Sequence, residues 1–182
     1  NDINDPDGEI ALCTLSAINW GSFRNPADMQ KACALAVRGL DALLSYQHYP
    51  ILAAQLATEN RRPLGVGIIN FAYWLAKHDV SYSNPDALEL VDTWAQHWSY
   101  YLIKASADLA AEQGACPKNN ETKYSDGVLP IDTYKREVDE LVQHTDKVDW
   151  PGLREQLKAT GIRNSTLMAL MPAETSAQIS NS

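Results

Sequence analysis

The sequence predicts a helix-rich α/β fold that forms one sector of a larger α/β barrel. Three short apolar segments have the length of buried strands, and amphipathic helices separate them along the chain. The sequence predicts about six helices but only about three strands, and so few strands cannot form a self-contained doubly wound sheet. The 182 residues suit one domain or a large part of one.

The N-terminal part begins with a predicted strand. Residues 9–18 read EIALCTLSAI, a short apolar stretch typical of a buried strand that runs into a turn. Asn25 and Pro26 then match an N-cap followed by proline at the first helical position. Apolar residues at helical spacing extend this helix to about Tyr46, and a shorter helix is predicted over residues 51–60.

The middle of the chain combines a strand with the longest helical pattern. Residues 64–71 read LGVGIINF, which predicts a short buried strand turning into a helix that ends near Lys77. Asn84 and Pro85 form a second pair of N-cap and proline, and the pattern after them is helical for more than seven turns. Gly114 stands where a glycine commonly ends such a helix.

The C-terminal part holds shorter elements. Residues 116–130 show little periodicity and are predicted to form a loop, while residues 132–144 are predicted to form an amphipathic helix. Another helix is expected between its N-cap Asp149 and its stop Gly161. The apolar segment STLMALM, residues 165–171, predicts the last strand.

Charge and cysteine content exclude several classes of protein. Fifteen Lys and Arg against 23 Asp and Glu give a net charge of −8, which argues against partners such as nucleic acid or anionic membrane. No apolar run approaches the ~20 residues of a membrane span. The acidic N-terminus does not resemble a signal peptide, and three widely spaced cysteines do not suit a disulfide framework. We therefore expect a cytoplasmic protein, and both termini look like cuts in a longer chain.

The three cysteines differ in their surroundings. Cys13 lies on a short apolar segment, where a buried structural cysteine is the common outcome, so the residues alone leave its role open. Cys33 lies on the apolar stripe of a helix and is expected to be structural. Cys116 precedes a proline in a loop, and nothing near it in sequence lowers its pKa.

The segment after the last predicted strand is a candidate anion site. A strand, a sharp turn at Pro172 and a helix start would leave backbone N–H groups without helical partners. Thr175 and Ser176 add two hydroxyl groups. The same residues also suit ordinary N-capping, so phosphate binding and capping remain equal alternatives at this point.

Weaker patterns indicate ordinary packing. Gly65 and Gly67 resemble half of a dinucleotide-binding fingerprint, but Asn70 stands where the third glycine belongs, which disfavours a Rossmann-type dehydrogenase. Close packing of strand and helix explains these glycines better. The four histidines are dispersed and predict no metal site. Tyr100 and Tyr101 lie on a long helix that also carries tryptophans, and we expect them to pack as core aromatics.

Four long blocks resemble the class I ribonucleotide reductase large subunit, in the same order and with the same spacing. Together they extend the resemblance over essentially the whole chain. The blocks are ALCTLSAIN (11–19), RRPLGVGIINFAYWLAK (61–77), EQGACPKNNETKYSDGVLPIDTYK (112–135) and RNSTLMALMPAETSAQISN (163–181).

The resemblance implies a fold, a reaction and site residues. Residues 1–182 would belong to a ten-stranded α/β barrel, incomplete at both ends, that reduces ribonucleoside diphosphates to 2′-deoxyribonucleoside diphosphates by thiyl-radical chemistry. Cys13 would be one of two cysteines that reduce C2′ and become a disulfide. The residues implied to bind the substrate diphosphate are Pro172, Ala173, Glu174, Thr175 and Ser176.

The resemblance also implies partners outside this chain. The chain itself would bind no cofactor: a metal-containing small subunit supplies the radical, the effectors ATP and dATP bind elsewhere, and thioredoxin or glutaredoxin reduces the disulfide. The family's radical cysteine lies in an Asn-x-Cys-x-Glu strand that is absent from these 182 residues. The isolated chain is therefore expected to be inactive without the rest of the large subunit. The alternative is a non-catalytic phosphate-binding barrel segment of a split or defective reductase.

Overall fold

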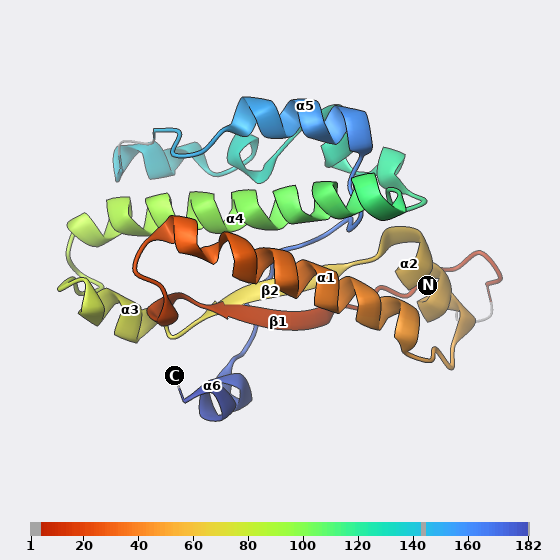
Figure 1. Cartoon of the computed structure of the whole chain (residues 1–182), viewed down its shortest axis with the longest axis horizontal. Coiled ribbons are helices and arrows are strands. Elements are labelled where there is room, and N and C mark those ends of the chain that lie inside the picture. The colour runs from red at the N-terminus through yellow and green to blue at the C-terminus, as the bar shows by residue number, and fades with distance from the viewer. Residues whose placement is uncertain (1–4, 143–144, 182) are drawn as a thin grey trace.

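A computed structural model of the chain describes residues 5–142 and 145–181. A small parallel sheet is covered on one side by stacked layers of helices, with α1 next to the sheet, then α4, then α5 (Figure 1). The short helix α6 lies on the other side of the sheet (Figure 1). In chain order the strands and helices are β1 (Thr14–Asn19), α1 (Gln30–Tyr46), α2 (Leu52–Arg61), β2 (Leu64–Ile69), α3 (Phe71–Lys77), α4 (Asp86–Gln113), α5 (Trp150–Thr160) and α6 (Glu174–Ser180).

The sheet has β2 at its centre. Strands β1 and β2 are parallel, with Thr14 opposite Leu64 and Asn19 opposite Ile69. A third extended segment, residues 166–169, runs parallel to β2 along its other edge. The N–H of Leu64 donates to a carbonyl of this segment at 3.0 Å, and one isolated parallel bridge follows. The strand predicted over the last apolar segment is thus present only as this short pairing.

The core lies between the sheet and the helix layers. Helix α1 buries Cys33, Val37, Leu40 and Leu44, whose spacing of three or four residues places them on one face of the helix. The sheet contributes fully buried side chains such as Val66 from the same side. The apolar stripe predicted from the sequence is therefore the face of α1 that is buried in the core.

Local capping signals fix the ends of the long helices. The side-chain oxygen of Asn84 accepts from the N–H of Asp86 at 2.9 Å where α4 begins, and α4 ends at Gly114 with φ = 87°. Asp149 accepts from the N–H of Gly152 at 2.9 Å in the first turn of α5, which ends at Gly161 with φ = 70°. The predictions for these two helices are confirmed.

The amphipathic helix predicted over residues 132–144 is wrong for the part that the structure describes. Residues 130–132 and 136–140 form separate 3₁₀ turns, and residues 143 and 144 lie outside the described residues. Of the apolar side chains in this segment, Val138 and Leu141 are exposed and Val142 is half-buried. A short helix gains most of its stability by burying an apolar face, and here most of that face is uncovered.

Two further differences concern the start of the first strand and the extent of the sheet. The first strand begins at Thr14, so the residues directly before it, including Cys13, lie outside the strand predicted from residue 9. The described residues therefore form a helix-rich α/β sector with a small parallel sheet, and not a ten-stranded barrel. Within these residues no helix combines the length and the apolar character required to cross a bilayer.

Candidate functional site

The side of the sheet that faces away from α1, α4 and α5 carries the candidate site, and we call it the open face. Side chains alternate across a strand, so residues 65 and 67 of β2 point to the face opposite Val66. Val66 is 0% exposed in the core, whereas Leu15 of β1, on the open face, is 49% exposed. Among the described residues, α6 and the segment leading into it lie on this side of the sheet (Figure 1).

Cys13 lies at the amino end of the open face. It directly precedes β1 and is exposed as a residue, but its sulfur rests against the sheet at Gly65. A Cβ atom built on Gly65 would lie 2.8 Å from Cys13 Sγ. Partial burial against the sheet raises the pKa of the Cys13 thiol, so the group stays protonated at neutral pH.

The other two cysteines are inaccessible. Cys33 is 0% exposed on α1, and burial raises the pKa of its thiol to about 12. Cys116 is also buried, and desolvation raises the pKa of its thiol. All three cysteines lie among the described residues, and Cys13 is the one that a second thiol or a substrate can reach.

The segment implied to bind diphosphate opens helix α6. Ala173 is the N-cap residue, and Glu174, Thr175 and Ser176 form the first turn with exposed side chains. The first N–H groups of a helix have no partner within it, so this turn offers backbone donors beside two hydroxyl groups. The Glu174 carboxylate favours the helix start electrostatically, but it also adds a negative charge next to these donors.

The far end of α6 approaches the carboxyl ends of the strands. Ser180 and Asn181 line a cavity of about 450 Å³ together with Asn19, Asn70 and Tyr73. Asn70 has a left-handed backbone with φ = 63°, and its amide donates to the side-chain oxygen of Asn19 at 3.1 Å. Helix α6 and Cys13 thus share one side of the sheet, although no hydrogen bond joins them among the described residues.

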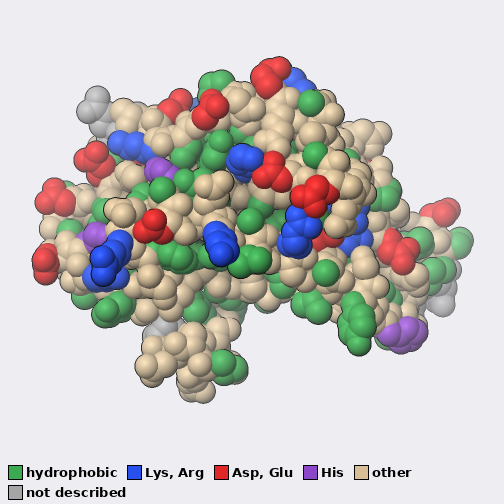
Figure 2. Space-filling view, viewed as in Figure 1, with side chains coloured by type: hydrophobic (Ala, Val, Ile, Leu, Met, Phe, Trp, Pro, Cys, Tyr) green, Lys and Arg blue, Asp and Glu red, His purple; other side chains and the backbone are tan. Residues whose placement is uncertain are grey.

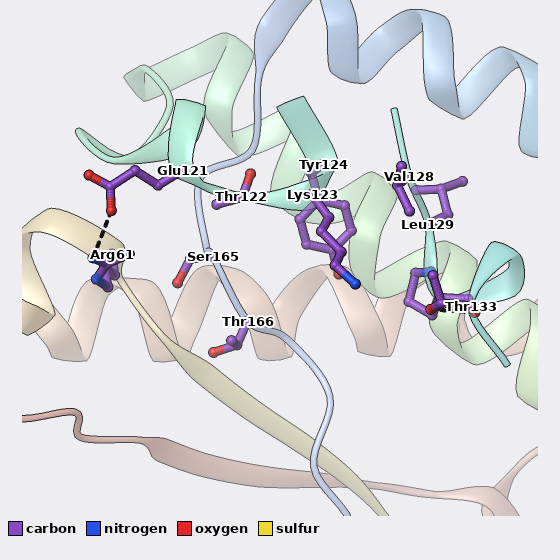
Figure 3. A pocket seen from close by; sticks show the side chains of 11 residues that line it. Arg61, Glu121, Thr122, Lys123, Tyr124, Val128, Leu129, Thr133, Ser165 and Thr166 are labelled. Atoms are coloured by element: carbon purple, nitrogen blue, oxygen red, sulfur yellow. Dashed lines mark hydrogen bonds and ion pairs between the residues drawn. The ribbon is translucent and has the colours of Figure 1, made fainter. Parts of the chain in front are cut away.

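A second cavity of about 420 Å³ lies at the amino end of β2, between the end of α2, the loop after α4 and residues 165–166 (Figure 3). Sequence reasoning missed this cavity, because its walls come from segments without periodicity. Arg61, on its rim, donates to Glu9 and to Glu121, both at 2.8 Å. Lys118 also pairs with Glu9, at 3.4 Å. Two carboxylates thus neutralise these two cations, and a further cation, Lys123, also lines the cavity.

Surface charge does not create a broad anion site elsewhere on the face in view. Acidic and basic side chains are interspersed over the helical layers (Figure 2). With a net charge of −8, a phosphate needs local donors rather than the field of the whole protein. The helix start at α6 provides such donors.

The interpretation of Gly65 and Gly67 as strand–helix packing positions is wrong. Cβ atoms built on these glycines would meet Cys13, Leu15, Ala169 and Met171, which come from the neighbouring extended segments and not from a helix. The glycines face the open side of the sheet. Their direction depends on the register with β1, which the sequence of β2 does not reveal.

Comparison with known proteins gives consistent matches. Residues 3–182 match the family model described as ribonucleotide reductase, barrel domain. The chain is 54% identical over 179 residues to ribonucleoside-diphosphate reductase subunit alpha of Haemophilus influenzae, which covers 98% of this chain and 24% of that protein. It is 56% identical over 138 residues to ribonucleoside-diphosphate reductase 1 subunit alpha of Escherichia coli, covering 76% and 18% of the two chains.

A phage relative matches over a similar length. The subunit alpha of Enterobacteria phage T4 is 46% identical over 184 residues, covering 100% of this chain and 24% of the relative. The chain thus spans about a quarter of the length of the relatives that it matches from end to end.

Proposed function

Because this chain belongs to the ribonucleotide reductase barrel-domain family, we propose that it forms the part of a ribonucleoside-diphosphate reductase that supplies one redox cysteine and the substrate diphosphate site. The observation that carries the proposal is Cys13, the accessible thiol on the open face of a parallel sheet. In the whole subunit this sheet would be one sector of the ten-stranded barrel, with the open face toward its interior.

The proposed reaction requires two thiols. The C2′–OH bond of the ribonucleoside diphosphate breaks, its oxygen leaves as water, and a hydrogen takes its place at C2′. Cys13 and a second cysteine from the rest of the subunit supply two electrons and two protons and become a disulfide. A raised thiol pKa suits this role, because the sulfur must keep its proton until the substrate has bound.

Two partners complete the cycle. The radical that opens the reaction comes from a small, metal-containing subunit and not from this chain. The disulfide is then reduced by thiol–disulfide exchange with thioredoxin or glutaredoxin, which requires a sulfur that the reductant can reach. The exposure of Cys13 supports that step. Such a cycle is expected in the reducing environment of the cytoplasm.

The diphosphate would bind at the start of α6. Thr175 and Ser176 would donate through their hydroxyl groups, while the N–H groups of the first turn add uncharged donors. Pro172 and Ala173 lie in the irregular segment directly before these groups, with Ala173 as the N-cap residue. The position of α6 on the open side of the sheet supports a substrate that reaches from this helix toward Cys13.

A chimeric subunit tests the proposal. The matching segment of the Haemophilus influenzae subunit is replaced by this chain, and the chimera is given substrate and small subunit for one turnover without external reductant. Peptide mapping is then expected to find Cys13 in a disulfide with a cysteine outside the chain. Oxidation of Cys33 or Cys116 with Cys13 still a free thiol would refute the assignment.

The same chimera distinguishes the alternative, a phosphate-binding segment without redox function. That alternative is favoured only by the donors of α6, which do not depend on Cys13. It predicts that the chimera binds substrate while Cys13 is still a free thiol after incubation with substrate and small subunit. The 182-residue chain alone is expected to show no turnover.

A further inference from the structure

Gly65 lies where no side chain has room. A Cβ atom built on it would be 2.6 Å from Leu15 Cδ2, 2.8 Å from Cys13 Sγ and 3.1 Å from Ala169 Cβ. Ordinary contacts between such atoms are about 3.5–4.0 Å. Any residue larger than glycine would therefore have to displace its neighbours, and the Cys13 sulfur is one of them.

Backbone conformation does not explain this glycine. The glycines with a left-handed backbone are Gly114, Gly127 and Gly161, and Gly65 is not among them. A glycine inside a strand normally weakens it, because the unfolded chain loses more entropy and no side chain packs. The reason for glycine at this position is therefore the space above it.

We infer that Gly65 is a positioning residue for Cys13, because its missing side chain leaves the space in which the Cys13 sulfur rests on the open face. The Cys13 sulfur can then contact β2 at Gly65 and still be reached from the open face. The consequence of this placement for catalysis rests on the function proposed above for Cys13, whereas the placement itself does not.

Two of the three neighbours of Gly65 can move, which makes the inference testable. Cys13 Sγ and Leu15 Cδ2 are ends of exposed side chains that can rotate away from a new methyl group, whereas Ala169 Cβ, at 3.1 Å, would have to shift by a few tenths of an ångström with its backbone. At Gly67 the situation differs, because a Cβ there would lie 2.6 Å from the backbone oxygen of Ala169. Gly65→Ala is thus expected to move the thiol, while Gly67→Ala is expected to strain the third extended segment.

The experiment measures the rate at which iodoacetamide alkylates Cys13 in the full 182-residue chain across a range of pH. In Gly65→Ala the sulfur turns outward and regains solvent, so its pKa falls toward the ordinary thiol value. Because a lower pKa leaves more thiolate at a given pH, the alkylation rate below the pKa is expected to rise about three-fold. Gly39→Ala is the matched control, since a Cβ there meets nothing within 4 Å, and it should leave the rate unchanged.

Protection of Cys33 and Cys116 from alkylation reports in the same digest that the chain is folded. If Gly65→Ala folds with an unchanged Cys13 pH profile, the positioning role is refuted. If Gly65→Ala unfolds, two double variants decide: a melting temperature restored more by Cys13→Ala than by Leu15→Ala supports the inference, and restoration by Leu15→Ala alone or by neither refutes it. None of these readouts requires turnover, so the inference and the proposed function can fail separately.

Discussion

Arg62 and Asp41 form a buried ion pair in which Arg62 Nε donates to Asp41 Oδ1 at 2.6 Å, with side-chain exposures of 9% and 4%. The same carboxylate oxygen accepts from Asn164 Nδ2 at 2.9 Å, and the other accepts from Arg163 Nε at 3.3 Å. Asp41 belongs to α1, Arg62 directly precedes Pro63 and β2, and Asn164 precedes the third extended segment. One carboxylate therefore holds the amino ends of two neighbouring strands against the helix that covers them.

Removing this charge should be costly. Asp41→Asn keeps the volume but leaves Arg62 buried without its counter-charge, and breaking a buried pair in this way destabilises by about 3–5 kcal/mol. We expect a loss of that order in the free energy of unfolding, measured by urea titration. Glu112→Gln is the control, because it removes the half-exposed pair with Arg38 and should cost at most about 1 kcal/mol. Equal losses in the two variants would contradict the role of Asp41.

The long helices could be predicted from the sequence because their signals are local. The caps at Asn84 and Asp149 and the glycines 114 and 161 act through the nearest backbone groups, whatever the rest of the fold does. The segment around Val138 has a helical pattern too, but whether it forms a helix depends on whether another element covers its apolar side chains. That information lies far away in the sequence, so periodicity alone predicted the wrong structure there.

The buried thiol of Cys33 should make the free energy of unfolding depend on pH in the alkaline range. Burial raises its pKa from 9.0 to about 12, so between these values the unfolded chain releases a proton that the folded chain keeps. The free energy of unfolding therefore falls as pH rises above 9, while below pH 9 both states are protonated and the thiol adds no pH dependence. From pH 9 to 10 the wild type should lose about 1 kcal/mol more than Cys33→Ala.

Urea titrations at the two pH values, with reductant present, measure this difference. Cys13→Ala is the comparison variant, because the Cys13 thiol is exposed and should contribute a smaller change. If the wild type and Cys33→Ala lose stability in parallel between pH 9 and 10, the thiol of Cys33 is not held protonated by the fold.

Two glycine-to-alanine substitutions should have opposite signs. At Gly161 the backbone has φ = 70°, and a Cβ would lie 2.8 Å from Ala115 Cβ, so Gly161→Ala adds both backbone strain and a clash. A loss of more than about 1 kcal/mol is expected. Gly39→Ala lies inside α1 with open space around it, and it should stabilise by about 0.5–1 kcal/mol. Melting curves of the two variants against the wild type check both signs.

The candidate site was less predictable than the helices. Local chemistry did not single out Cys13, since its pKa is raised and no charged neighbour activates it, and the assignment came from the resemblance of the surrounding block. Gly65 was misread for a related reason. A glycine leaves no trace in the alternation of polar and apolar residues, so the face on which it lies becomes known only from the pairing of β1 with β2.

Thr175 offers the sharpest test of the diphosphate site. Its side chain is exposed and makes no hydrogen bond to another described residue, so Thr175→Ala should change the free energy of unfolding by less than about 0.5 kcal/mol. In the chimeric subunit the same substitution removes a donor to a charged group, which is worth about 1.5–3 kcal/mol. The Kd of a ribonucleoside diphosphate should therefore rise at least about ten-fold.

Thr166→Ala, at another exposed threonine, is the matched control and should leave this Kd unchanged. Binding of the nucleoside without phosphates provides the chemical control, since a loss confined to the diphosphate identifies the group that Thr175 contacts. An unchanged diphosphate Kd in Thr175→Ala would mean that the threonine only belongs to the helix start and that the phosphate lies elsewhere.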